Sequence, residues 1–328
     1  MRRHHARMTA WLPAALGVVM TTLLAGVASG LLPQPRWPPL VRKQAPADDA
    51  RAADQAEQSW RQASQFLRHA KQQAGLLSGA EGAADPSGLL GADITPLVTT
   101  LGSLEAKRLS ASPAWARALT TQLWGAGVGR GSVVAASCSG SFPALNLALA
   151  CACRALGAEL ITISSVTSST WGANQPGFTW PEMEARLVEA GLISAVSVGV
   201  ATGGENDQAA GLAPDARALA EQIGDRAAAQ LRASRLKPAT FQQAVALRMA
   251  LFDRAAGGRP IMVYVNIGGS QASVGRSMTA LKLKSGWLDR EAFADPGDDG
   301  VMALLAKRGV RILHLLNIRD LAAQWGVL

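Results

Sequence analysis

A run of small polar residues, Ser-Cys-Ser-Gly-Ser-Phe-Pro at positions 137–143, combines hydroxyl groups with the signals of a sharp turn. It lies between a short apolar stretch typical of a buried strand and an apolar helical stretch. We expect Ser141 to cap that helix and Pro143 to occupy its first turn. Free backbone N–H groups at a helix start favour anions, and Gly140 would let a ligand approach the backbone. The run therefore predicts an anion-binding loop, with Asn146 directed toward the same mouth, although a plain capped turn is the alternative.

Two further loops have similar chemistry, and their candidate ligand-binding residues are Gly203, Gly204, Gly268, Gly269 and Ser270. Each loop follows an apolar segment predicted to be a strand. Because the carboxyl ends of parallel strands meet at one edge of a sheet, we expect the three loops to converge on one polar pocket. Glu205 and Asp207 are the acids of these loops and the best candidates for a general base. Solvated surface acids are the alternative.

A catalytic interpretation is also open at this edge. Ser139 or Ser141 as nucleophile, with His314 and Asp207 assisting, would form a set that resembles a hydrolase triad. His314 lies inside a predicted strand, so a buried, hydrogen-bonded imidazole is the competing interpretation. The chain lacks the Gly-x-Ser-x-Gly elbow of one large hydrolase class.

Other segments add charge and a long loop to the predicted pocket. Lys107 and Arg108 lie near several hydroxyl residues and would supply positive charge for an acidic ligand, or simply form a solvated helix face. The long loop over 164–180 contains two tryptophans, and we assign Ser165 and Asn174 in it to the ligand-binding set. Long loops at a ligand edge are often lids or specificity elements. Thr179 and Glu182 have capping-box spacing.

Histidine and cysteine are too scattered to predict a metal site, and no cofactor is predicted. Cys138, Cys151 and Cys153 are odd in number. The last two are two positions apart on a predicted helix, where they would point to different sides and would not pair. We expect three buried, inert thiols.

Apolar segments and helical segments alternate from about residue 112 onward. This pattern predicts an α/β fold, with a Rossmann-like, mostly parallel sheet and helices on both faces. The predicted strands are 132–137, 159–164, 193–200, 260–267 and 310–315. The predicted helices are 113–124, 143–156, 181–190, 214–233, 239–256, 300–308 and 320–325.

The charge of the chain is concentrated at its N-terminus. The 328 residues carry a net charge of +8, but six basic and no acidic residues precede position 44, which leaves 26 basic and 24 acidic residues for the rest. A nearly neutral body argues against a nucleic-acid partner. Residues 8–32 are uncharged and long enough to cross a bilayer, so we predict one N-terminal transmembrane helix over 1–32, with a cleaved signal peptide as the alternative.

The rest of the chain divides into three predicted parts. Five prolines mark 33–53 as an extended linker. Residues 54–90 form a helical segment whose surface helix, 54–77, has Trp60, Phe66 and Leu67 as an apolar stripe. Residues 91–328 form the α/β domain. Basic residues flank the apolar segment equally on both sides, so the positive-inside rule leaves its orientation open, and we favour an exported body.

Several short segments of the chain are similar to the poly-gamma-glutamate system proteins, which are membrane-anchored proteins encoded beside the polyglutamate capsule synthase. The similar segments are 102–108, 139–146, 163–165, 171–174, 178–180, 268–271 and 314–318, and the run 139–146 is the most specific. The resemblance covers about residues 90–328. It implies a bacterial cell-surface setting, with the synthase complex and poly-gamma-glutamate as partners, and it supplies no established reaction.

Three functional hypotheses follow from these observations. In the first, a single-pass protein of the cytoplasmic membrane binds an anionic γ-glutamyl ligand at the strand-end loops. In the second, the protein is a hydrolase or transferase that acts on γ-glutamyl bonds. In the third, it is a non-catalytic assembly subunit that contacts the synthase through its anchor and helix 54–77.

Overall fold

The computed structural model describes residues 47–77, 85–194 and 197–327 of the chain. All of them belong to one compact unit, Leu40–Leu328, and the other unit, Met1–Pro39, lies outside the described residues. The predicted anchor and most of the predicted linker therefore also lie outside them. Among the residues that the structure does describe, no helix combines the length and the apolar character needed to cross a membrane.

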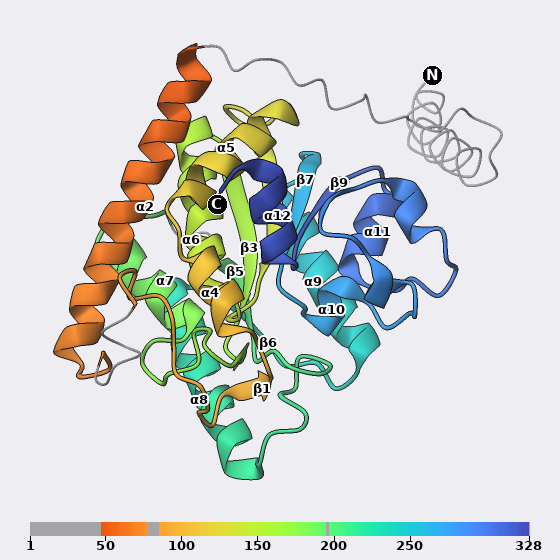
Figure 1. Cartoon of the computed structure of the whole chain (residues 1–328). Helices are drawn as coiled ribbons and strands as arrows, with labels where there is room; N and C mark the ends of the chain where they lie inside the picture. The colour runs from red at the N-terminus through yellow and green to blue at the C-terminus, as the bar shows by residue number, and fades with distance from the viewer. Residues whose placement is uncertain (1–46, 78–84, 195–196, 328) are drawn as a thin grey trace, which may run out of the picture. The chain divides into compact units, whose positions relative to one another are not determined.

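A seven-stranded sheet forms the centre of this unit (Figure 1), in the order β6-β5-β3-β2-β7-β9-β8. All neighbouring strands are parallel except β8, which pairs antiparallel with β9. The prediction of a mostly parallel α/β sheet is therefore confirmed. The strands are β2 (Val133–Cys138), β3 (Glu159–Ser165), β5 (Ser197–Ala201), β6 (Ser234–Leu236), β7 (Ile261–Ile267), β8 (Gly286–Leu288) and β9 (Arg311–Leu315).

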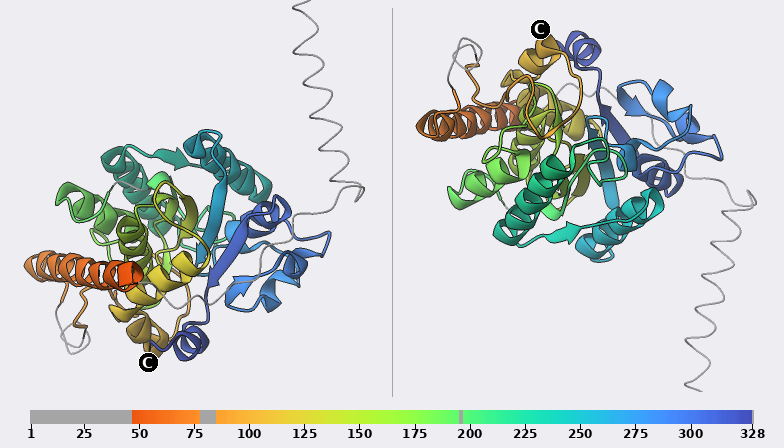
Figure 2. Two further views of the ribbon diagram at one scale, coloured as in Figure 1. Left: turned by 90° about the horizontal axis from the view of Figure 1, so that it is seen from above. Right: turned by 90° about the horizontal axis from the view of Figure 1, so that it is seen from below.

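Helices lie on both sides of the sheet, as Figures 1 and 2 show. Side chains of β2 alternate between two cores: Val134 and Ala136 belong to one, Val133 and Ala135 to the other. The first core includes residues of α2 (Ala47–Gln73), α5 (Ala114–Gly125), α6 (Pro143–Leu156), α7 (Trp180–Glu189) and α12 (Ile318–Trp325). The second includes residues of α9 (Phe241–Ala256), α10 (Gln271–Val274) and α11 (Val301–Lys307).

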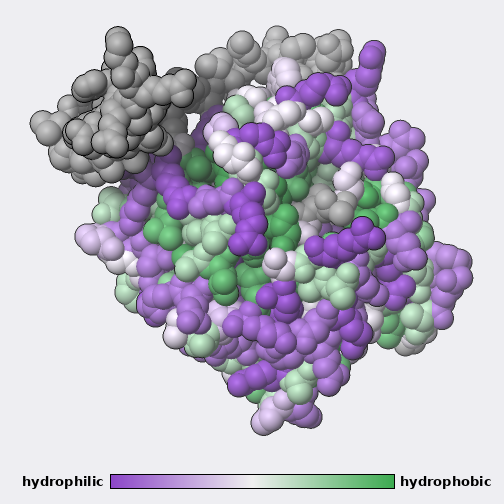
Figure 3. Space-filling model, turned by 180° about the vertical axis from the view of Figure 1, so that it is seen from behind, coloured by the Kyte–Doolittle hydropathy of each residue, from purple (hydrophilic) through white to green (hydrophobic). Residues whose placement is uncertain are grey.

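The remaining elements are one helix packed on β5, a separate pair of short strands and several short helices. A third, smaller core joins α8 (Pro214–Leu231) to β5. The strands β1 (Val98–Thr100) and β4 (Ser168–Ser169) form a separate parallel pair that the sequence pattern did not predict. The short helices are α4 (Leu104–Ser110), η1 (Ala280–Lys282) and η2 (Arg290–Phe293). Figure 3 shows that on the face seen from behind, hydrophilic residues surround a hydrophobic area.

Helix α2 packs directly on the domain instead of standing apart from it. It begins at Ala47, so residues 47–53 of the predicted linker are helical. Trp60 and Leu67 are buried, as predicted for the apolar stripe, whereas Phe66 is 38% exposed. The indole of Trp60 donates a hydrogen bond to the carbonyl oxygen of Ala144 in α6, at 3.0 Å. The apolar stripe of this helix is therefore largely occupied within the chain.

Candidate functional site

A cavity of about 370 Å³ lies where the loops after β2, β3, β5 and β7 meet. The chain order along the sheet reverses between β2 and β7, and such switch points are where α/β sheets usually bind ligands. The volume falls in the range typical of small-molecule sites. The lining residues are Thr99, Thr100, Ser139, Ser141, Ser165, Thr167, Ser168, Gly203, Gly204, Glu205, Ala210, Gly269, Ser270 and Gln271.

The loop after β2 presents Ser139 and Ser141 to this cavity. The hydroxyl of Ser139 accepts a hydrogen bond from the backbone N–H of Ser141 at 3.0 Å. The prediction that Ser141 caps α6 is wrong, because Phe142 is the capping residue and makes no side-chain cap. The Ser141 hydroxyl instead accepts from the backbone N–H of Ser169 at 3.1 Å, which joins the loop after β2 to β4.

Two other residues predicted at this turn hold its shape and are not part of the cavity lining. The side chain of Asn146 is buried and donates to the Ser139 carbonyl oxygen at 2.9 Å. A Cβ atom at Gly140 would lie 2.8 Å from the carbonyl oxygen of Thr167. The glycine is therefore needed so that two loops of the protein can approach each other.

Lys107 lies behind the loop after β2, on α4. The residue is only 1% exposed, and its ammonium donates to the carbonyl oxygen of Ser141 and, at 2.8 Å, to the hydroxyl of Ser169. Its Nζ atom is 3.9 Å from the centre of the Phe142 ring. Burial lowers the pKa of Lys107 from 10.5 to about 7. Lys107 therefore lies behind the residues that form the cavity wall.

Arg108, which we predicted beside Lys107 as a second charge for the ligand, belongs to a different place. It lines a smaller cavity of about 70 Å³ together with Lys71 and Asp85. Consecutive residues on a helix point in different directions, so only one of the two cations can face the loop after β2. Of the predicted pair, Lys107 alone adjoins the larger cavity.

Two hydroxyl groups in the cavity lining are buried and have no hydrogen-bond partner within the described chain: Thr167 Oγ1 and Ser270 Oγ. They come from different loops, after β3 and after β7, and the Thr167 residue is only 3% exposed. Buried polar groups in proteins are almost always paired with protein or with bound water. Thr167 is not one of the predicted site residues, although it lies in the long loop over 164–180 that the sequence places at the ligand edge.

The loop after β5 supplies Gly203 and Gly204, both with positive φ, at +87° and +71°. A Cβ atom at Gly203 would lie 2.5 Å from Thr167 Oγ1. The carbonyl oxygen of Thr202 also accepts the backbone N–H of Thr167 at 2.9 Å. These contacts fix the loop after β5 against the loop after β3. The two loops can approach this closely because the glycines have no side chain and adopt positive φ.

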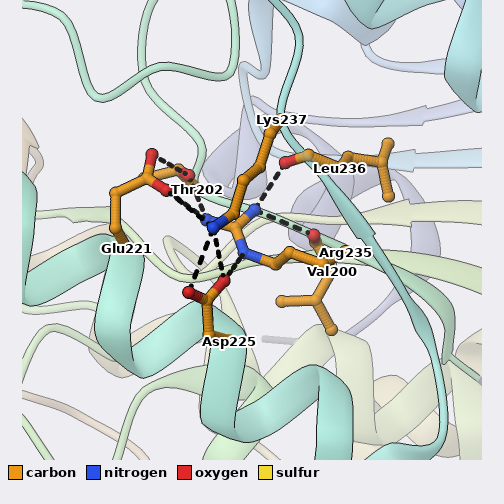
Figure 4. A network of polar contacts seen from close by, with 7 residues as sticks. All are labelled: Val200, Thr202, Glu221, Asp225, Arg235, Leu236 and Lys237. Atoms are coloured by element: carbon orange, nitrogen blue, oxygen red, sulfur yellow. Dashed lines mark hydrogen bonds and ion pairs between the residues drawn. The ribbon is translucent and has the colours of Figure 1, made fainter.

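A polar network centred on Arg235 fixes the start of this loop (Figure 4). The guanidinium donates to the Thr202 hydroxyl at 2.6 Å and to the carbonyl oxygen of Val200 at 3.1 Å. It also bonds two carboxylates of α8, Glu221 at 3.3 Å and Asp225 at 3.1 Å. Arg235 thus links β6, the end of β5 and α8. Its partner Thr202 lies one residue before the pair Gly203 and Gly204.

The predicted catalytic set does not assemble. Ser139 and Ser141 line the cavity, whereas Asp207 and His314 do not. Both carboxylate oxygens of Asp207 accept hydrogen bonds from Arg248, and the side chains of both residues are completely buried. His314 Nδ1 is bonded to the Asn266 amide at 2.9 Å, and burial lowers the pKa of its imidazole to about 4.

Arg248 also reaches a chain of hydroxyl groups beneath the central strands. Its guanidinium donates to the Ser137 hydroxyl at 3.2 Å, and that oxygen accepts from the Tyr264 hydroxyl at 2.6 Å. Tyr264 is in turn bonded to Ser273 at 2.7 Å. Sequence reasoning missed Arg248. The available signal was an arginine within the apolar stripe of α9.

Two more predicted ligand residues have structural roles. The side-chain amide of Asn174 exchanges two hydrogen bonds with the backbone of Ala92, at 3.0 and 2.7 Å, and is fully buried. Gly268 has a φ of +88°, and a Cβ atom there would lie 2.8 Å from the Cβ of Ser139. Ser165, Gly203, Gly204, Gly269 and Ser270 do line the cavity.

A buried carboxyl group lies in α7, away from the cavity lining. Glu184 accepts hydrogen bonds from the hydroxyls of Ser197 at 2.6 Å and Ser164 at 3.0 Å. Burial raises its pKa from 4.5 to about 7 despite these hydrogen bonds. In the same helix the predicted capping box of Thr179 and Glu182 is confirmed.

The three cysteines are free and buried, and burial raises the pKa of each thiol, as expected for inert residues. In the ranges 47–77, 85–194 and 197–327, no group of His, Cys, Asp and Glu side chains is arranged to hold a metal ion. No protein-family model, no curated protein and no solved structure matches this chain.

Proposed function

We propose that the cavity binds an anionic γ-glutamyl ligand, and that the protein does so as a membrane-anchored component of a bacterial poly-gamma-glutamate synthesis and export system. The observation that carries the binding proposal is the pair of unpartnered hydroxyls, Thr167 Oγ1 and Ser270 Oγ. They lie in the lining of a cavity at the switch point of the sheet. A bound ligand would supply the hydrogen-bond partners that these two groups lack.

The chemistry of the lining supports a ligand rich in carboxylate and amide oxygens. Most lining residues are serine, threonine or glycine, so the wall offers hydroxyl and backbone donors. Helix α6 starts beside Ser141, and a helix start favours negative charge. Lys107 adds a cation behind the same loop. A γ-glutamyl chain carries one carboxylate per unit and amide groups between them, which matches these donors.

The geometry of the cavity favours ligand binding over hydrolysis or group transfer. A serine nucleophile needs a base within hydrogen-bond reach. Both carboxylate oxygens of Asp207 are bonded to Arg248, His314 is bonded to Asn266 through Nδ1, and neither residue lines the cavity. The hypothesis of an assembly subunit is weakened, because most apolar side chains of the α2 stripe pack on the domain itself.

Binding of a purified γ-glutamyl hexamer to the full-length protein, measured by calorimetry in detergent, tests the proposal. Thr167→Val and Ser270→Ala each remove one unpartnered hydroxyl with little change in shape. Each should weaken binding by about twofold to tenfold, the range for one hydrogen bond. Thr121→Val is the matched control, since Thr121 is an exposed residue of α5 that bonds only its own helix. Absence of binding, or equal affinity in all variants, would overturn the proposal.

The setting in the membrane belongs to the same proposal. We assign residues 8–32 to a single anchor, with the body exported, on the apolar run described above. Removing residues 2–32 should shift the protein from the membrane fraction to the soluble fraction of the producing cell. Retention of the shortened chain in the membrane fraction would contradict an N-terminal anchor.

A further inference from the structure

Glu205 is the one charged side chain among the described residues that line the cavity. It is exposed, and no described lysine, arginine or histidine forms an ion pair with it. The basic residues of the neighbouring elements are already engaged: Arg235 by Glu221 and Asp225, and Arg248 by Asp207. The loop after β5 therefore brings an unneutralised carboxylate to a cavity whose other walls consist of hydroxyl groups and backbone.

The positive side of the cavity belongs to a different loop. Lys107 and the start of α6 lie at the loop after β2, behind Ser141. Strand β3 separates β2 from β5 in the sheet. The negative and positive charges therefore lie at loops that follow two non-adjacent strands of the sheet. The two charges at the cavity are at different loops, with an acid at one wall and a cation behind another.

A uniformly anionic ligand would be repelled by Glu205, whereas one with an amine at one end would not. We propose that the site recognises the free amino end of an acidic, peptide-like chain, with the terminal ammonium at Glu205 and a carboxylate toward Ser141 and Lys107. This inference rests on the function proposed above. It narrows the proposed ligand from any segment of the polymer to the amino end of a chain.

The backbone that carries Glu205 is held in place from several sides. The backbone N–H of Asn206 donates to the side chain of Gln271 at 3.1 Å, which links it to the loop after β7. Glu205 itself pairs with Ala210 as an isolated β-bridge. Asp207, two residues on, is fixed by Arg248. With the backbone fixed, only the Glu205 side chain has to be ordered when its carboxylate binds an ammonium group.

The test compares two γ-glutamyl trimers on the full-length protein, one with a free amino end and one with that end acetylated. Calorimetry should show the free trimer bound about tenfold more tightly by the wild-type protein. In Glu205→Gln the difference should vanish, through weaker binding of the free trimer. Glu189→Gln, which changes an exposed acid of α7 outside the cavity lining, should behave as wild type.

The outcomes separate this inference from the broader proposal. Equal binding of both trimers by the wild-type protein would overturn recognition of the amino end while leaving ligand binding intact. A preference for the free trimer that persists in Glu205→Gln would remove Glu205 from the recognition. Failure of both trimers and of the hexamer to bind would overturn the proposed function itself, and this inference with it.

Discussion

Asp207 and Arg248 form a bidentate ion pair in which both side chains are completely buried, with Nε to Oδ2 at 2.8 Å and Nη2 to Oδ1 at 2.9 Å. The pair joins the loop after β5 to helix α9. Asp207 has a positive φ of +60°, a conformation that costs energy in a residue other than glycine. The ion pair holds that conformation in place, and with it the loop that carries Gly203, Gly204 and Glu205.

Replacing Arg248 by methionine should lower the free energy of unfolding by about 3–5 kcal/mol, because a carboxylate would remain buried without its partner. Urea titration measures this change. Arg254→Met, on the exposed side of the same helix, should change stability by less than about 0.5 kcal/mol. The double variant Asp207→Asn with Arg248→Met should regain part of the loss. If Arg248→Met is no less stable than Arg254→Met, the pair does not hold the loop.

Gly203→Ala should destabilise the protein, since the residue has a φ of +87° and its new Cβ would lie 2.5 Å from Thr167 Oγ1. The conformational cost alone is roughly 1–2 kcal/mol. Gly125→Ala serves as the comparison, because nothing lies within 4 Å of a Cβ there and the residue ends helix α5. Thermal unfolding of both variants should show a lower Tm for Gly203→Ala alone. Similar Tm values would mean that the loop after β5 can relax away from Thr167.

Glu184 should make stability fall as the pH rises from about 4.5 to about 7. Its pKa is raised to about 7 in the folded chain against 4.5 when exposed, so the folded state binds more protons over that window. Stability from the neutral carboxyl is complete below the lower value and lost above the higher one. The total loss corresponds to roughly 3 kcal/mol, from the free energy of one pKa unit.

Urea titrations across that pH range, in wild type and in Glu184→Gln, test this effect. The glutamine variant should lack this part of the pH dependence and gain relative to wild type near neutral pH. Glu189→Gln, an exposed acid of the same helix, should follow the wild-type profile. Parallel profiles for wild type and Glu184→Gln would show that the carboxyl titrates at an ordinary pH.

Lys107 should make ligand affinity depend on pH near neutrality. Burial lowers its pKa to about 7, so its ammonium form is present below that value and disappears above it. Affinity for a carboxylate-bearing γ-glutamyl hexamer should therefore fall between about pH 6.5 and 9, as the positive charge behind Ser141 is lost. Calorimetry on Lys107→Met should show weaker binding with no such slope. A slope equal to that of wild type would assign the titration to another group.

Much of the fold was predictable from the sequence, because strands and helices alternate with clear apolar periods. Helix α6 has the predicted bounds, 143–156, and its start is signalled by Pro143. The convergence of the strand-end loops follows from a parallel sheet alone. The strands β1, β4, β6 and β8 were missed, since each has only two or three residues and too little pattern to detect.

The site itself was less predictable, because its contacts join distant parts of the chain. Lys107 bonds Ser141 and Ser169, which are 34 and 62 residues away. Asp207 looked like a free loop acid, and only its partner 41 residues further on removes it from the cavity. Residue type and spacing identify groups capable of chemistry, but pairing in space decides which of them stay free.

The hydrogen bond from the Tyr264 hydroxyl to Ser137 joins the two central strands across 127 residues, and the cavity walls extend from Thr99 to Gln271. Contacts between such distant residues form slowly, because a long loop must close before they contribute. A chain emerging during synthesis lacks part of the cavity wall until β7 and the loop after it have joined β2. We therefore expect that a partly made chain does not bind the proposed ligand until residues 269–271 are in place.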